Sequence, residues 1–284
     1  MAKYYLDTEF VEGPQTRRIC GIPIGKTKPT IDLISIGIVA KDDREYYAIS
    51  KDFNLREAWE RFDEIIEPTS GDVKNIFPEG RKKKFYWLRE NVLKPIFYEW
   101  IGKDINFHDY DYMFTFNEFK KLMHKHGKTN KQIANEIFEF VNPDLGFAVE
   151  SYRNSELKPG GRLFDHFKKH NAAEHEGRFV AQPDFYAYYS AYDWVVFCQL
   201  FGTMNDIPKG FPMFCYDLKQ IMDEKANELM NKVCYESGNH TIWSLNKALS
   251  QIKESAYYPI NENPHHALSD AHWDKKLHEF LLNT

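Results

Sequence analysis

The stretch KYYLDTEF at residues 3–10 has the composition of a strand and carries acids at two alternate positions, Asp7 and Glu9. Side chains two residues apart leave the same face of a strand, so we expect these two carboxylates to lie side by side. Neighbouring carboxylates repel each other unless a cation lies between them, and Mg²⁺ and Mn²⁺ favour oxygen ligands of this kind. An exposed strand also often carries acids, so the spacing alone leaves both interpretations open.

The segments around this stretch predict an α/β fold. Residues 31–40 (IDLISIGIVA) are rich in β-branched residues and predict a central strand buried on both faces. Residues 44–50 predict a third strand, whereas the glycines and prolines of residues 11–30 predict a loop. Apolar residues at helical spacing mark the segments 55–66, 86–101, 117–126, 130–141, 194–201, 217–230, 243–252 and 266–282, with one more strand at 185–190. This order indicates a mixed central β-sheet flanked by α-helices.

Composition narrows the class of protein. A chain of 284 residues with 43% hydrophobic content can bury the core of a single domain over residues 1–284. The net charge of −5 argues against a basic surface that coats nucleic acid regardless of sequence. No apolar run reaches the ~20 residues of a membrane span, and the chain does not open with a signal-peptide pattern. We therefore expect a cytoplasmic protein with no membrane association.

The four cysteines bear on metal binding. They are scattered and form no CxxC pair, which excludes the usual zinc spacings and gives no sign of a disulfide framework. We expect them to be reduced and structural.

Asp193 lies between the strand predicted at residues 185–190 and the helix predicted at residues 194–201. Aspartate is favoured at such a position as a helix N-cap, because its side-chain oxygen accepts backbone N–H groups. The N-cap is the default interpretation. A catalytic role requires Asp7 and Glu9 to lie on a neighbouring strand.

His265 and Asp270 lie within NPHHALSDAHWD, residues 263–274. Five residues turn an ideal helix through about 500°, so the two side chains can converge only if His265 precedes the helix. Pro264 favours this arrangement because it limits the helix upstream. Imidazole exchanges a proton near neutral pH, which suits a general base. His266 is the alternative, and a capping or surface role is the default for either histidine.

Three segments in order resemble the motifs of the DEDDh 3′–5′ exonucleases: LDTEF at residues 6–10, YYSAYDWVVFCQLFG at 188–202 and HHALSDA at 265–271. These enzymes belong to the ribonuclease H-like superfamily. Within it, the chain is most similar to the RNase AS family, exoribonucleases that prefer adenylate-rich RNA. The similarity extends to the segments REYYAIS, WLRENVLKPI, QIANEIFEFV and FPMFCYDLKQIMDE. The resemblance implies a ribonuclease H-like fold.

The resemblance also implies a catalytic set. Four acids correspond to those that bind two Mg²⁺ ions, for which Mn²⁺ is expected to substitute: Asp7, Glu9, Asp193 and Asp270. His265 corresponds to the general base at the H-x4-D spacing, whereas His266 would give the H-x3-D spacing of the tyrosine variant of the superfamily. The implied reaction releases 5′-nucleoside monophosphates from the 3′ end of single-stranded RNA.

Substrate contacts are expected beside the acids, at Thr8, Phe10, Arg17 and Arg18. Phe10 suits stacking on a terminal base, although a place in the core fits it equally well. Arg17 and Arg18 suit contacts to phosphate.

Several segments have no counterpart in the compact RNase AS proteins. These insertions lie near residues 14–30, 60–84, 101–128, 151–180 and 231–262, and they suit a partner surface, a lid or a substrate channel. The resemblance further implies a homodimer. Two alternatives stay open: a single-stranded DNA 3′–5′ exonuclease, because no residue pattern identifies a contact to the 2′-hydroxyl, and a nucleic-acid-binding or scaffold protein with an inactive site.

Overall fold

The computed structural model describes residues 2–67, 81–101, 113–142, 183–208, 210–237 and 244–283. The predicted insertion at residues 151–180 lies outside these ranges. The chain forms two compact units, the first made of Met1–Thr8, Ser35–Ala48 and Thr129–Thr284 and the second of Glu9–Ile34 and Ile49–Lys128.

A five-stranded sheet has the strand order β3-β2-β1-β6-β7. Its strands are β1 (Lys3–Ile19), β2 (Ile22–Ala40), β3 (Glu45–Ile49), β6 (Asp184–Ala187) and β7 (Tyr216–Asp217). Short turns join β1 to β2 and β2 to β3, a connection that only antiparallel neighbours can make. In contrast, β6 pairs in parallel with both β1 and β7. The sheet is therefore mixed, as the sequence predicted.

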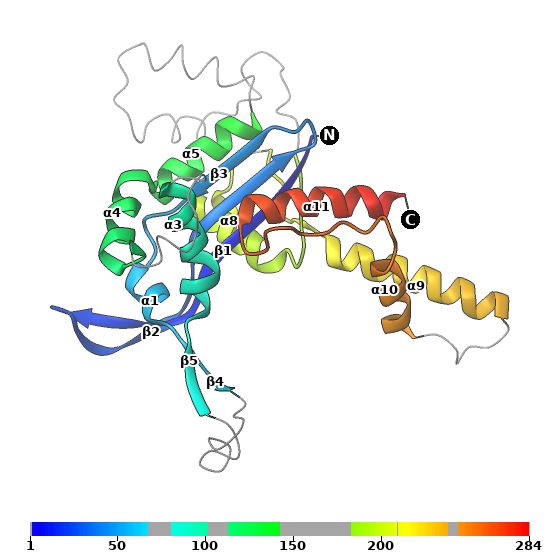
Figure 1. Ribbon diagram of the computed structural model, residues 1–284. Coiled ribbons are helices and arrows are strands. Elements are labelled where there is room, and N and C mark those ends of the chain that lie inside the picture. The colour runs from blue at the N-terminus through cyan, green and yellow to red at the C-terminus, as the bar shows by residue number, and fades with distance from the viewer. Residues whose placement is uncertain are drawn as a thin grey trace, which may run out of the picture. The chain divides into compact units, whose positions relative to one another are not determined.

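Helices cover both faces of the sheet in the first unit (Figure 1). The helices of this unit are α5 (Asn130–Val141), α8 (Ala191–Phe201), a 3-10 helix (Met204–Asp206), α9 (Leu218–Ser237), α10 (Leu245–Lys253) and α11 (Ala267–Leu282). Alternation along β1 sends Tyr4 and Tyr5 to opposite faces. The Tyr4 hydroxyl donates to the Val141 carbonyl at the end of α5, 3.1 Å away. Tyr5 instead joins the apolar cluster of α9 and α11 that includes Leu218 and Leu277.

Gly37 in β2 lets the first turn of α11 approach the sheet closely. A Cβ atom at this position would lie 2.4 Å from backbone atoms of Ala267 and Leu268. Because the obstructing atoms are backbone, the Gly37→Ala variant can be accommodated only by moving strand or helix. We expect it to lower the free energy of unfolding by about 2–3 kcal/mol, as overpacking does in a dense core. Urea unfolding should be compared with Ile36→Val on the same strand, for which we expect a loss of only about 1 kcal/mol. Equal losses would contradict the close approach.

The second unit corrects one prediction. Residues 11–30 are not a loop, because β1 and β2 continue through them as a hairpin. Cys20 and Gly21 form its two-residue turn with φ values of 49° and 82°, the left-handed conformation that matches the twist of a hairpin. The glycines and prolines that suggested a loop therefore belong to a long hairpin, which the local composition did not reveal.

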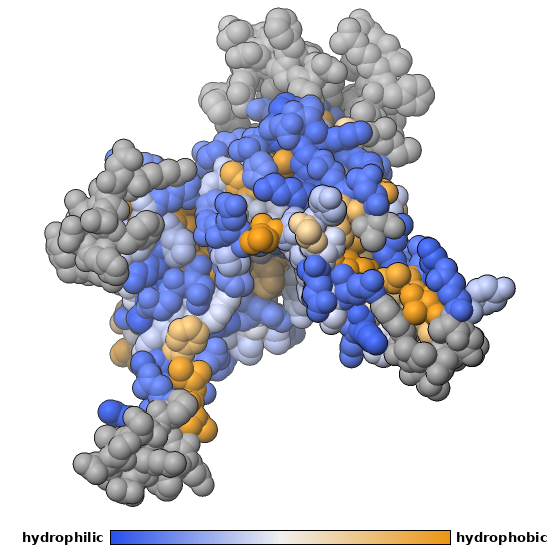
Figure 2. Space-filling model, turned by 45° about the vertical axis from the view of Figure 1, so that its right-hand side comes forward, coloured by the Kyte–Doolittle hydropathy of each residue, from blue (hydrophilic) through white to orange (hydrophobic). Residues whose placement is uncertain are grey.

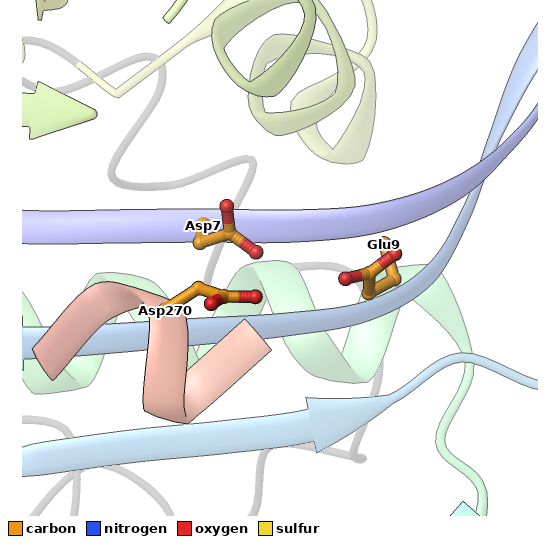
Figure 3. A group of neighbouring side chains, drawn as sticks. All are labelled: Asp7, Glu9 and Asp270. Carbon is orange, nitrogen blue, oxygen red and sulfur yellow. The ribbon is translucent and has the colours of Figure 1, made fainter. Parts of the chain in front are cut away.

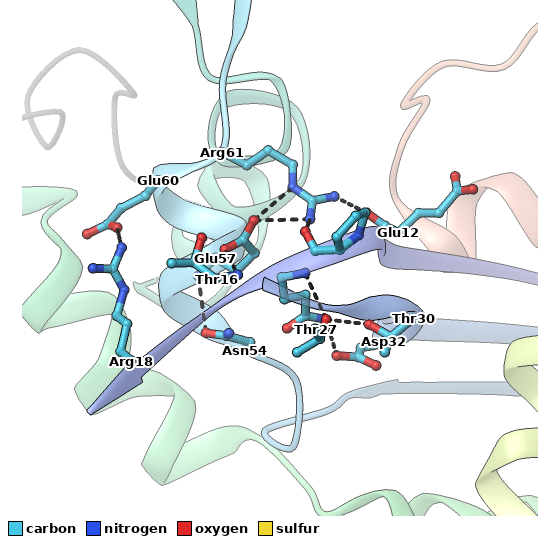
Figure 4. A network of polar contacts seen from close by, with 12 residues as sticks. Glu12, Thr16, Arg18, Thr27, Thr30, Asp32, Asn54, Glu57, Glu60 and Arg61 are labelled. Carbon is cyan, nitrogen blue, oxygen red and sulfur yellow. Dashed lines mark hydrogen bonds and ion pairs between the residues drawn. The ribbon is translucent and has the colours of Figure 1, made fainter. Parts of the chain in front are cut away.

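Polar contacts join this hairpin to α1 (Leu55–Glu60) within the second unit (Figure 4). The backbone N–H of Thr16 donates to Glu57 at 2.9 Å. Arg18 forms an ion pair of 2.6 Å with Glu60. The helix predicted at residues 55–66 thus ends early, and its side chains hold the hairpin.

The other described elements of this unit are β4 (Asp63–Glu67), β5 (Arg81–Phe85), a π-helix (Arg89–Leu93), α3 (Lys94–Ile101) and α4 (Phe116–His126). Strands β4 and β5 pair antiparallel as a separate sheet, so pairing between distant segments overrides the helical spacing of residues 63–66. The helix predicted at residues 86–101 contains the π-helix, which ends two residues before Pro95. Proline has no N–H to donate to the preceding turn, which is a common cause of such irregularity.

The described surface is mainly hydrophilic in the view of Figure 2. Apolar residues appear there as smaller patches between the hydrophilic ones. Among the described residues, no helix combines the length and the apolar character that crossing a membrane requires.

Candidate active site

Asp7, Glu9 and Asp270 form a cluster of carboxylates (Figure 3). One carboxylate oxygen of each lies within 4.8 Å of those of the other two. Asp7 and Glu9 leave the same face of β1, as predicted from their spacing, and Asp270 comes from the first turn of α11. All three side chains are partly buried. A hard divalent cation such as Mg²⁺ fits this donor set, because it prefers oxygen ligands and would offset the repulsion between the acids.

Asp193 lies in the first turn of α8 and is only 6% exposed. The N-cap interpretation is wrong, because Ser190 occupies that position and the Asp193 carboxylate is bonded to another strand. Its Oδ1 accepts the backbone N–H of Thr8 at 2.9 Å and the Thr8 hydroxyl at 2.7 Å. Asp193 is therefore tied to β1 through the residue between Asp7 and Glu9. Asp7 and Glu9 lie on β1, which pairs with β6, the strand that precedes Asp193. The arrangement of strands that a catalytic role for Asp193 requires is therefore present.

Burial sets the protonation of Asp193. The pKa of this carboxyl is raised to about 6: removal from water is the main cause and nearby Asp217 adds to it, while the two hydrogen bonds from Thr8 oppose the shift. Burial also raises the pKa of Asp270, against hydrogen bonds from Asn261 and His265. In the absence of a cation, charged carboxylates are therefore unfavourable at this site.

His265 precedes α11, as the sequence analysis required. It adopts a φ of 67°, and its backbone N–H donates to Oδ2 of Asp270 at 2.9 Å. His266 is the N-cap of α11, with Nδ1 accepting the backbone N–H of Ser269 at 3.3 Å. Its ring also stacks on Tyr47 with centroids 4.7 Å apart. The capping interpretation thus holds for His266, and the role of His265 as a base stays a prediction.

Sequence reasoning missed two acids that support this site, Asp217 and Asp274. Asp274 is 1% exposed and accepts the backbone N–H of Tyr188 at 3.1 Å. Asp217 accepts the backbone N–H of Tyr189 at 3.2 Å. These side chains replace strand partners, which explains why β6 ends at Ala187 instead of continuing to residue 190. Together they hold the turn that leads into Asp193.

A signal for Asp274 existed in the sequence. It follows Asp270 by four residues, so both carboxylates lie on the same face of α11. Burial raises the pKa of Asp274 well above its ordinary value, and the charges of Asp193 and Asp270 raise it further. No comparable local signal links Asp217 to the site: besides the backbone N–H of Lys219 at 2.8 Å, it accepts that of Tyr189, 28 residues away in the chain.

The four residues predicted to contact substrate are in different environments. Thr8 is 5% exposed and bonded to Asp193, and Phe10 is partly buried on β1. Arg17 is exposed on the hairpin, and Arg18 pairs with Glu60. The structure thus brings Thr8 to Asp193, and substrate contact by all four residues stays a prediction.

The fold and this site define an α/β protein with a cluster of acids suited to a divalent cation. The chain belongs to the family described as the 3′-5′ exoribonuclease Rv2179c-like domain, whose profile matches residues 117–282, more than half of the chain. Two relatives are named 3′-5′ exoribonuclease MT2234.1 and 3′-5′ exoribonuclease Rv2179c, from Mycobacterium tuberculosis strains CDC 1551 / Oshkosh and ATCC 25618 / H37Rv. Each is 22% identical over 228 residues, which are 79% of this chain and 76% of the relative.

The family match covers only part of the carboxylate cluster. It includes Asp193 and Asp270, whereas Asp7 and Glu9 precede residue 117, where it begins. The proximity of Asp7 and Glu9 to Asp270 is therefore an observation independent of the family match.

Proposed function

We propose that the chain is a divalent-metal-dependent 3′–5′ exoribonuclease of the DEDDh type with a ribonuclease H-like sheet. Its substrate would be single-stranded RNA, preferentially rich in adenylate, and its products 5′-nucleoside monophosphates. The observation that carries the proposal is the convergence of Asp7, Glu9 and Asp270 within 4.8 Å in a chain of an exoribonuclease family.

The metal-binding residues would be Asp7, Glu9, Asp193 and Asp270. Two bound Mg²⁺ ions would supply charge stabilisation for the scissile phosphate and for the leaving 3′-oxygen. Asp7 and Glu9 present their carboxylates from one strand face. Thr8, the residue between them, binds the carboxylate of Asp193, which does not belong to the cluster of Asp7, Glu9 and Asp270. His265, in the turn before α11, would accept the proton of the attacking water. Its exposed position would leave the imidazole accessible to solvent and substrate.

A 5′-labelled oligoadenylate RNA tests the proposal. With Mg²⁺ we expect a ladder that shortens from the 3′ end, and no shortening with EDTA or with Asp193→Ala protein purified in parallel. Mixed-sequence RNA and a DNA of the same sequence would measure the substrate preference. Faster shortening of DNA would favour the deoxyribonuclease alternative, and no shortening of any oligomer with Mg²⁺ or Mn²⁺ would contradict the catalytic function.

A further inference from the structure

The segment at residues 259–266, which we call the Asp270 strap, lies against the start of α11. The indole N–H of Trp273 donates to the Pro259 carbonyl at 3.0 Å and anchors one end. His266 caps the helix at the other end. The strap is therefore fixed to the same helix at two points, on either side of Asp270.

Asn261 lies within the strap and directs its side-chain amide at Asp270. Its Nδ2 donates to Oδ1 of Asp270, and its own Oδ1 accepts the backbone N–H of Asn263 at 3.3 Å. The second contact fixes the orientation of the amide, because a backbone N–H can only donate and must therefore meet the side-chain oxygen. The donor end is thus directed at the carboxylate.

Both oxygens of Asp270 receive a hydrogen bond from the strap. Asn261 donates to Oδ1, and the backbone N–H of His265 donates to Oδ2 at 2.9 Å. Each carboxylate oxygen has two lone pairs, so one on each oxygen stays available to a cation shared with Asp7 and Glu9. Two donors on different oxygens also prevent rotation of the carboxylate. Of the two, only the Asn261 donor is a side chain and can be removed by substitution.

We infer that Asn261 is a positioning residue that holds the Asp270 carboxylate in the orientation needed to bind a divalent cation with Asp7 and Glu9. The inference rests on the proposed metal-dependent function and adds a residue that touches neither cation nor substrate. Partners that orient metal ligands commonly change metal affinity by about 10–100-fold when removed. Since Asn261 is neutral, its removal changes orientation without changing the charge of the site.

The test compares Asn261→Ala with Asn263→Ala in the full chain. Asn263 is the matched control within the strap, because its contact to the Asn261 side chain uses the backbone N–H, which alanine retains. Mn²⁺ binding to each protein would be titrated by calorimetry and by electron paramagnetic resonance without RNA. RNA shortening would be measured as a function of Mg²⁺ concentration, and thermal unfolding would monitor the fold.

For Asn261→Ala we expect Mn²⁺ binding about tenfold or more weaker than in the parent protein. Saturating Mg²⁺ should restore most of its kcat, and Asn263→Ala should match the parent protein in both measurements. Unchanged Mn²⁺ affinity, with activity falling only in step with the unfolding temperature, would overturn the positioning role. A parent protein that binds no Mn²⁺ would instead overturn the proposed metal site itself, so the two failures are distinguishable.

Discussion

Asp7→Asn is expected to slow the shortening of RNA by ~10³-fold or more, equivalent to about 4 kcal/mol of lost transition-state stabilisation. The substitution retains the shape of the side chain and removes one charge from the three clustered carboxylates. A cation held by several acids at once loses affinity and correct placement when one of them becomes neutral. Single-turnover shortening of labelled oligoadenylate at fixed Mg²⁺ would measure the loss.

Glu12→Gln is the matched control for this variant. Glu12 is an exposed acid on the same strand, outside the cluster of Asp7, so its removal changes the net charge equally without removing a ligand. We expect its rate to stay within about twofold of the parent rate, since surface substitutions usually have little effect. Full activity in Asp7→Asn would show that the reaction does not use this cluster.

Helices whose boundaries are set by neighbouring residues could be predicted from the sequence. The helix predicted at residues 130–141 coincides with α5, and the one predicted at residues 266–282 differs from α11 by a single residue. Their boundaries are encoded locally, by the Thr129 capping box in α5 and by the His266 cap in α11. Such caps depend on residues three positions apart and can be recognised in a single segment.

Elements that depend on distant partners could not be predicted in this way. Residues 63–67 have apolar residues at helical spacing, yet they form β4 because β5 pairs with them from beyond residue 80. The strand predicted at residues 185–190 ends early because Asp217 and Asp274 bind its backbone N–H groups. Tertiary contacts of this kind override local propensity.

The same distinction applies to the candidate site. The spacing of Asp7 and Glu9 within one strand predicted that they share a face, and their proximity to Asp270 is now observed. The contact between Thr8 and Asp193 joins positions 185 residues apart, so no local pattern could reveal it. Asn261 lies outside any helix or strand, where no periodicity identifies the direction of a side chain.

Asp193→Asn is expected to make the metal-free protein more stable while abolishing its activity. Burial raises the pKa of Asp193 to about 6, so the carboxylate, which is charged at neutral pH, lowers the stability of the folded state relative to the unfolded state. An asparagine keeps the oxygen that accepts both hydrogen bonds from Thr8 and removes the buried charge. We expect the free energy of unfolding at pH 7.5 in EDTA to increase by about 1–3 kcal/mol. Urea unfolding would measure the gain, and the RNA assay would measure the loss of activity.

The pH dependence of the free energy of unfolding provides a control for the Asp193→Asn prediction. An acid whose pKa is higher in the folded than in the unfolded state contributes stability that is complete below the unfolded pKa and is lost as pH rises through the folded pKa. For Asp193 that loss occurs as pH rises through about 6. The parent protein in EDTA should therefore lose stability between pH 5 and pH 7.5, and Asp193→Asn should lose less. The exposed Asp42, which pairs with Arg44, offers the matched variant Asp42→Asn, which should retain the slope of the parent protein. A less stable Asp193→Asn protein with an unchanged slope would show that the buried carboxylate is charged at little cost. Burial would then give no reason for the site to require a cation.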